Sequence, residues 1–196
     1  YFKRVTVKKT GLPEGAVGSA VISMWDVAGY LAALVCAKRL KIINTVEFNQ
    51  RMTRLVYWLN TMELNGVGLP NKFYSAKTGK MLNVMGQPGV AGHSAIDLGR
   101  LLIWLRIVRN EFIAHAEAVD RAVLRWNFRH VLDNKGALYG SYVKKNGLYQ
   151  YYREGRMGLR QYSAKGFSFW GFRTDAARRY DHVSQVTILN YLLPFD

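Results

Sequence analysis

Cysteine, acidic residues and metal-ligand patterns are scarce in this chain, and each shortage excludes a class of protein. One cysteine among 196 residues excludes a disulfide framework within the chain. We interpret this residue, Cys36, as a buried thiol because its neighbours Leu34, Val35 and Ala37 are apolar. The 4 histidines show no spacing typical of metal ligands, and no glycine-rich phosphate-binding loop is present. We therefore expect neither a metal nor an organic cofactor.

Acidic residues are outnumbered by basic ones, with 13 Asp and Glu against 28 Lys and Arg and a net charge of +15. Such an excess favours anionic partners such as an acidic polysaccharide, nucleic acid or lipid head groups. The basic residues are spread along the chain without a recognised nucleic-acid motif, so we predict no nucleic-acid partner. Asp26 interrupts the longest apolar run, residues 20–37, which predicts a buried helix and no membrane span in this chain.

The apolar residues that are present alternate between two helical patterns. Residues 23–41, 94–109 and 154–170 are apolar nearly all round, and a helix of this kind must be buried on every side. Residues 45–62 and 114–132 instead carry a single apolar stripe opposite charged residues. We predict a mainly all-α fold with two concentric layers, in which each outer helix returns the chain. Successive inner helices then begin on one face.

The connections between these helices are long for a simple bundle. Residues 64–93 and 133–153 lie on the face where inner helices begin, and long loops in such a place often carry function. Asn146-Gly147 stands between two aromatic, alternating runs, which predicts a β-hairpin near residues 137–152. The tail from Thr174 onward fits either an extended strand or a short helix. We treat residues 1–196 as a single domain and, because Tyr1 replaces a starting Met, as part of a longer protein.

Three carboxylates lie where a polar loop meets an inner helical segment. They are Asp26, Asp97 and Glu154, and they converge if the inner helices run in the same direction. Both aspartates also fit a capping box with the serine three residues earlier, and Glu154 could pair with an arginine, so structural roles stay open. Hydrolysis of a glycosidic bond needs one carboxyl to donate a proton and another to activate water or attack carbon. The three positions together suit that chemistry.

Aromatic residues in the same inner segments could bind a sugar. Trp25, Trp104, Tyr162 and Trp170 lie near the three carboxylates in the predicted arrangement. Aromatic rings are natural platforms for sugar faces, although the same spacing also fits packing in a core.

Four motifs, taken in order, resemble those of a known family. They are Trp25-Asp26; residues 69–74 (LPNKFY) with Thr78-Gly79; residues 92–102 (GHSAIDLGRLL); and residues 152–167 (YREGRMGLRQYSAKGF) with Trp170-Gly171. Over most of residues 19–172 their order and spacing are similar to those of the glucoamylase-like domain of unknown function found in bacterial envelope proteins. That family is related to (α/α) toroid glycoside hydrolases and to the glucan-processing regions of cyclic glucan synthases.

The resemblance implies a two-layer (α/α) toroid of helical hairpins. Complete toroids are roughly twice as long as this chain, so the chain would hold about half of a ring, which another protein segment would complete. The resemblance also implies a polysaccharide or oligosaccharide ligand and a location in the cell envelope, in the periplasm.

The first functional hypothesis is a glycoside-hydrolase-like domain that cleaves or binds a bacterial envelope polysaccharide or glucan. In this hypothesis Asp26, Asp97 and Glu154 form the acid/base set, and Glu154 donates the proton. The predicted substrate contacts are Trp25, Asn71, Lys72, Tyr74, His93, Arg100, Arg156, Tyr162 and Trp170.

Two alternatives stay open. A polysaccharide lyase would act on an anionic polymer, and Asn71, Tyr74, His93 and Arg100 supply suitable side chains for neutralising a carboxylate and removing a proton. Loop hydrogen bonding by Asn71 and Tyr74 and a helix cap at His93 are the structural interpretations of the same residues. A non-catalytic polysaccharide-binding or assembly module would fit an incomplete ring. It would also fit two departures from the family pattern: His93 stands where such proteins often carry an aromatic residue, and Leu159 stands where they often carry a tyrosine.

Overall fold

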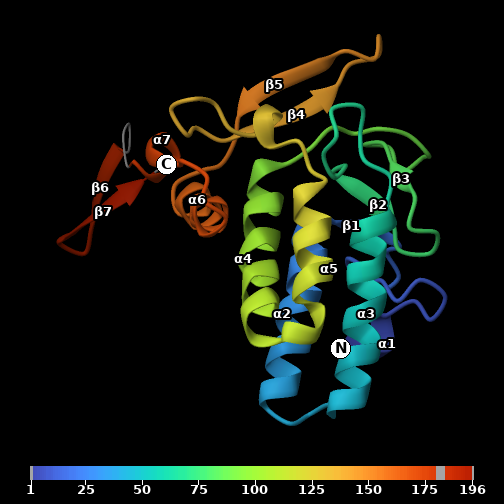
Figure 1. Cartoon of the computed structure of the whole chain (residues 1–196). Coiled ribbons are helices and arrows are strands. Elements are labelled where there is room, and N and C mark those ends of the chain that lie inside the picture. Colours follow the sequence, from blue (N-terminus) through green and yellow to red (C-terminus); the bar gives the residue numbers. More distant parts are fainter. Residues whose placement is uncertain (1, 180–183, 196) are drawn as a thin grey trace.

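The computed structural model describes residues 2–179 and 184–195 and is mainly helical (Figure 1). Four helices form the body of the molecule: α2 (Met24–Arg39), α3 (Thr45–Thr61), α4 (Ala95–Glu111) and α5 (Ile113–Leu124). Shorter helices are α1 (Phe2–Val5), α6 (Leu159–Phe169) and α7 (Asp175–Arg178), with a 3-10 turn at Phe128–His130. No helix within the described residues is long and apolar enough to cross a membrane.

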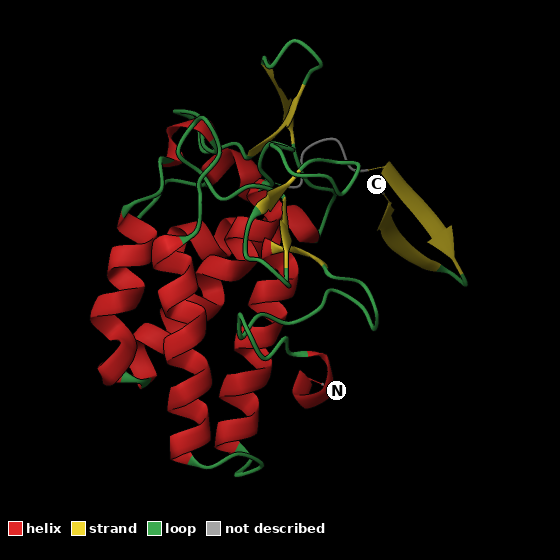
Figure 2. Cartoon of the chain, turned by 90° about the vertical axis from the view of Figure 1, so that its right-hand side faces the viewer, coloured by secondary structure: helices red, strands yellow, loops and turns green. Residues whose placement is uncertain are grey.

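The strands form three small antiparallel sheets. The first sheet orders β1 (Val21–Ser23), β2 (Phe73–Ser75) and β3 (Met81–Leu82). The second is the hairpin of β4 (Tyr139–Val143) and β5 (Tyr149–Arg153), and the third pairs β6 (Ser184–Ile188) with β7 (Tyr191–Phe195). Figure 2 shows the first two sheets and most of the long loops gathered at one end of the helices.

Contacts at both ends of the helices fix their directions. Arg100 stacks on Trp25 near the starts of α4 and α2, and Arg39 pairs with Glu111 at their ends, so α2 and α4 run parallel. In the outer layer the His115 ring lies within hydrogen-bonding distance of the Asn49 amide, at the starts of α5 and α3. α3 and α5 each begin where α2 and α4 end, and they run back toward the starts of those helices (Figure 1). This arrangement confirms the predicted two layers.

The core lies between these layers and is built from the apolar positions that the sequence pattern identified. Leu31 and Leu34 of α2, Leu101 and Leu105 of α4 and Phe48 of α3 belong to one cluster of buried side chains. Burial of this apolar surface is what stabilises the layered arrangement. The first sheet continues directly into α2 through Ser23, and it thereby fixes the start of that helix.

The prediction that Cys36 is buried is wrong, because its side chain is exposed. Cys36 follows Gly29 and Ala32 at helical spacing on one face of α2, and both of those residues are only partly buried. Apolar neighbours in the sequence therefore did not imply burial here.

The third inner helix differs from its prediction in start and direction. The prediction placed it at residues 154–170, whereas α6 begins at Leu159, because Gly155 and Gly158 adopt left-handed φ values of 99° and 82°. Figure 1 looks along α6 while α4 stands upright, so α6 crosses α4 rather than following it. The second outer helix also ends earlier than residue 132, at Leu124, and the 3-10 turn follows.

Two glycines permit the close contact between α4 and α6. A Cβ atom on Gly166 would lie 1.9 Å from the backbone oxygen of Gly99. The Ser163 hydroxyl donates a hydrogen bond of 2.9 Å to the Ile96 carbonyl at the same crossing. The backbones thus approach to a distance that any side chain would prevent.

We expect Gly166→Ala to lower the free energy of unfolding by about 1–3 kcal/mol or more, because α6 must move away from α4. Gly29→Ala is the matched control, since its new Cβ would lie 3.7 Å from the Arg100 guanidinium, in ordinary contact. Removing a mid-helix glycine there raises stability by up to about 1 kcal/mol. Urea denaturation followed by circular dichroism measures both values, and equal stabilities would contradict the close crossing.

Candidate active site

Two of the predicted catalytic aspartates lie in the first turns of the parallel helices α2 and α4. The Ser23 side chain caps α2, and the Asp26 Oδ2 atom accepts hydrogen bonds from the Ser23 amide at 2.8 Å and from its hydroxyl at 3.0 Å. The capping interpretation of Asp26 is therefore correct, and the box is complete. The Ser94 hydroxyl likewise accepts a hydrogen bond of 3.1 Å from the Asp97 amide.

Glu154 follows β5 and reaches the start of α4 from the hairpin. Its Oε2 atom accepts hydrogen bonds from the Ala95 amide and, at 3.4 Å, from the Ile96 amide. These are the first amides of the helix, which have no partner within it, and the helix dipole favours a negative charge there. Gly140 makes room for this contact, since a Cβ atom at that position would lie 2.6 Å from Oε2.

Lys72 and Tyr152 extend the site away from Glu154. The Lys72 ammonium donates a hydrogen bond of 2.9 Å to the Tyr152 hydroxyl, which in turn donates one of 3.3 Å to the Oε1 atom of Glu154. Burial lowers the pKa of Lys72, while the charges of Glu154 and Asp97 act in the opposite direction. Burial and the Glu154 charge raise the pKa of Tyr152, so this phenol keeps its proton.

Asp97 is the carboxyl with the most unusual acidity. Burial, reinforced by the Glu154 charge, raises its pKa from 3.8 to about 6, although hydrogen bonds from Ser94 and from the Trp25 backbone oppose the change. The charge of Asp26 also raises it. The structure therefore brings Asp26, Asp97 and Glu154 together at one end of the molecule. Among the described residues no three His, Cys, Asp or Glu side chains are arranged to hold a metal ion.

Some of the aromatic and basic residues predicted to bind substrate lie beside the carboxylates, and others lie elsewhere. Trp25 is partly exposed beside this cluster, and the Arg100 guanidinium stacks 4.0 Å from the centre of its ring. The Trp170 ring instead donates a hydrogen bond of 3.0 Å to the Leu102 carbonyl, farther along α4. Arg156 and Tyr162 lie on the exposed surface of the loop before α6 and of α6 itself.

Three predicted substrate contacts, Asn71, Tyr74 and His93, have no exposed surface. The Asn71 amide nitrogen donates to the carbonyls of Phe73 and Leu82, and its oxygen accepts from the amides of residues 91 and 92, later in the same long loop. The Tyr74 hydroxyl donates to the Glu63 carbonyl. The prediction that these residues touch a sugar is wrong, and the loop hydrogen-bonding interpretation is correct for Asn71 and Tyr74.

His93 has a structural role other than the predicted helix cap. Its ring bonds through Nδ1 to the Ser141 hydroxyl at 2.8 Å and through Nε2 to the His130 carbonyl at 3.2 Å. Burial lowers its pKa to about 4, so the ring is neutral at physiological pH. His93 thereby joins the β4–β5 hairpin to the loop that precedes α4.

Tyr152 belongs to the site although the sequence analysis did not select it. In a β-strand, residues two apart point to the same face. Tyr152 ends the aromatic run of the predicted hairpin two positions before Glu154, so this spacing could have identified it. The hairpin thus contributes two side chains to the site.

Comparisons with solved structures show the same fold in longer proteins. A "putative glucoamylase" from Bacteroides caccae matches 100% of this chain and 53% of its own length, with 16% identity and a TM-score of 0.69. An endo-β-1,2-glucanase from Chitinophaga pinensis, solved with sophorotriose and glucose, matches 100% of this chain and 52% of its own, with 14% identity and a TM-score of 0.69. A "putative glucoamylase" from Bacteroides fragilis matches 75% and 38%, with 14% identity and a TM-score of 0.58.

The chain therefore spans about half the length of the two solved proteins that it matches along its whole length. Its fold is part of the glucoamylase-like (α/α) toroid, as the motif resemblance implied. No curated protein matches the chain. A family model described as a protein of unknown function, DUF3131, matches residues 1–196, and the chain belongs to that family.

Proposed function

We propose that this protein is a glycoside-hydrolase-like domain that cleaves a glucan at the cluster of Asp97, Glu154 and Asp26. The observation that carries the proposal is the convergence of three carboxyl groups at the starts of α2 and α4, where burial and the Glu154 charge raise the pKa of Asp97 to about 6. A carboxyl that holds its proton up to about pH 6 can act as a general acid in mildly acidic solution, and a neighbouring carboxylate is the partner that glycoside hydrolysis needs. The toroid fold supports the same class of reaction.

The contacts change the roles that we first assigned within the carboxylate set. Both oxygens of Glu154 accept hydrogen bonds, from the α4 amides and from Tyr152. We therefore assign Asp97 as the proton donor in place of Glu154. Glu154 becomes a positioning residue, whose charge favours the protonated form of Asp97.

Asp26 is the remaining candidate for activating water. Its Oδ2 atom is held by the Ser23 cap, and the Oδ1 atom makes no hydrogen bond to another described residue. Trp25, the adjacent residue, offers a partly exposed ring for stacking against a sugar face. Water activation by Asp26 on one side of the glycosidic bond and protonation by Asp97 on the other would complete the reaction.

The substrate that we propose to test first is a β-1,2-linked glucan. The structural relative from Chitinophaga pinensis is an endo-β-1,2-glucanase solved with sophorotriose. We also propose that the protein acts in the cell envelope, and that a further polypeptide segment completes the ring, because the chain spans about half of that relative.

The structure disfavours the lyase alternative, because most of the residues that it requires are not accessible to a substrate. Asn71, Tyr74 and His93 have no exposed surface and use their polar atoms within the fold. The binding-module alternative keeps one favourable observation, the half-length match to the glucanase. Binding of a glucan without release of reducing ends would support that alternative over hydrolysis.

We expect Asp97→Asn to lower the rate of reducing-end release from β-1,2-glucan by at least 100-fold, within the range typical of general acid catalysis. Thr53→Ala, at an exposed position of α3 outside the cluster, is the control and should keep full activity. An Asp97→Asn protein with wild-type turnover would remove Asp97 from catalysis.

The same substitution should stabilise the fold above pH 6. The folded protein binds the Asp97 proton more tightly than the unfolded chain does, so this group lowers stability as the pH rises from 3.8 through about 6. At 1.36 kcal/mol per pKa unit, Asp97→Asn gains up to about 3 kcal/mol at pH 7.5 and nothing near pH 3.5. Urea denaturation at the two pH values measures the difference, and a loss of stability at pH 7.5 would contradict the burial of a charged Asp97.

Glu154→Gln tests the positioning role separately. Glutamine keeps one oxygen for the α4 amides but removes the charge, so the pKa of Asp97 should fall. The pH above which activity declines should then move to a lower value, and turnover at neutral pH should drop. A purely structural Glu154 would change stability without moving the pH profile of kcat/KM.

A further inference from the structure

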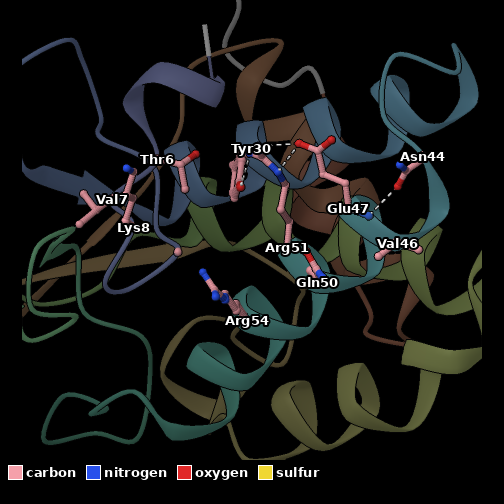
Figure 3. A pocket seen from close by; sticks show the side chains of 11 residues that line it. Thr6, Val7, Lys8, Tyr30, Asn44, Val46, Glu47, Gln50, Arg51 and Arg54 are labelled. Carbon is pink, nitrogen blue, oxygen red and sulfur yellow. Dashed lines mark hydrogen bonds and ion pairs between the residues drawn. The ribbon is translucent and has the colours of Figure 1, made fainter.

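A hollow lies on the flank of the molecule, away from the carboxylates. It is a cavity of about 560 Å³ between the N-terminal segment, α2 and the first half of α3 (Figure 3). Because α3 runs opposite to α2, the start of α3 lies toward the far end of α2 from Asp26 and Asp97. None of the residues proposed for glycoside hydrolysis lines this cavity.

The N-terminal wall of the cavity is held in place by the core. The Val7 amide donates to the Leu12 carbonyl at 2.9 Å, the Gly11 amide donates to the Val7 carbonyl at 2.8 Å, and the Leu12 side chain has no exposed surface. The Thr10 hydroxyl donates a hydrogen bond of 2.5 Å to the Ala76 carbonyl. This segment is therefore an ordered loop tied to the body of the protein.

Gly11 brings this loop onto the stem of Arg54. Its φ of 75° is left-handed, and a Cβ atom at this position would lie 3.2 Å from the Arg54 Cβ atom. The backbone of the loop thus packs along the Arg54 side chain. This contact supports the stem of Arg54 at the edge of the cavity.

One of the three cations that line the cavity is paired with a carboxylate, and the other two are not paired with any described residue. Arg51 donates to Glu47 at 2.8 Å and to the Tyr30 hydroxyl at 3.4 Å, and Figure 3 shows this pairing. Lys8 and Arg54 line the same cavity, and neither forms an ion pair or a hydrogen bond with another residue in the described part of the chain. The cavity therefore presents two unpaired positive charges, Lys8 on the N-terminal segment and Arg54 on α3, with a single, already paired carboxylate.

We propose that this cavity binds the anionic group of an acidic sugar, a carboxylate or a phosphate, between Lys8 and Arg54. A guanidinium binds either group through two parallel hydrogen bonds, and the ammonium adds a second charge. Gln50, exposed on the same wall, offers an amide for a sugar hydroxyl. The volume lies within the range typical of small-molecule sites. This site goes beyond the proposed hydrolysis and does not depend on it.

Calorimetric titration with glucuronate, glucose 6-phosphate and glucose tests the proposal at low ionic strength. We expect glucuronate, glucose 6-phosphate or both to bind, and glucose to show no binding, because the anionic group supplies the recognition. The two acidic probes distinguish a carboxylate ligand from a phosphate ligand. Failure of both to bind, or equal binding of glucose, would overturn the proposal.

Charge-removing variants locate the site. Arg54→Gln and, separately, Lys8→Gln should weaken binding of the acidic sugar at least tenfold, whereas Arg178→Gln, which removes an exposed charge on α7, should not. Asp97→Asn should leave this binding unchanged, so a failure of the proposed hydrolysis does not affect the result. Wild-type affinity in Arg54→Gln, or an equal loss in Arg178→Gln, would contradict binding at this cavity.

Discussion

The contact between the Glu154 carboxylate and the first amides of α4 is the interaction on which the candidate site depends. It ties the β4–β5 hairpin to the start of an inner helix, and it puts a negative charge next to Asp97. The helix end supplies donors that lack partners within the helix, so the charge is stabilised where it is needed. His93 also ties the hairpin to the loop before α4, through its hydrogen bond with Ser141. Hairpin and helix therefore position the two carboxyl groups together.

Asp26 and Asp97 show how similar sequences lead to different chemistry. Both stand three residues after a capping serine at the start of an inner helix. Asp26 completes its capping box, whereas the partial burial of Asp97 and, next, the charge of Glu154 raise the pKa of Asp97 to about 6. The capping position therefore does not exclude a catalytic role, and we propose one for each aspartate, as proton donor for Asp97 and as water activator for Asp26. What decides between these two roles is the neighbour that tertiary structure supplies.

The sequence predicts the parts of this fold that depend on local periodicity. The alternation of fully apolar and one-sided helices identified α2 to α5 and their two layers, because burial dictates that pattern. The direction of α6 was not predictable, since it follows from a contact between Gly99 and Gly166, which are far apart in the sequence. The burial of Asn71 was missed for a similar reason: its hydrogen-bond partners at residues 82, 91 and 92 come from a later part of the same long loop. Motif residues of this kind look available for binding until their partners are known.

The distribution of charge separates the two sites that we propose. The chain carries a net charge of +15, yet the starts of α2 and α4 gather Asp26, Asp97 and Glu154, with Lys72 and Arg100 as nearby cations. A polyanion would be repelled by these carboxylates, so the cluster suits a neutral glucan better than a uronate polymer. The unpaired cations Lys8 and Arg54 line a cavity elsewhere on the molecule, where an acidic group meets no unpaired carboxylate. Binding of an acidic group by Lys8 and Arg54 therefore need not interfere with the proposed acid–base chemistry at the starts of α2 and α4.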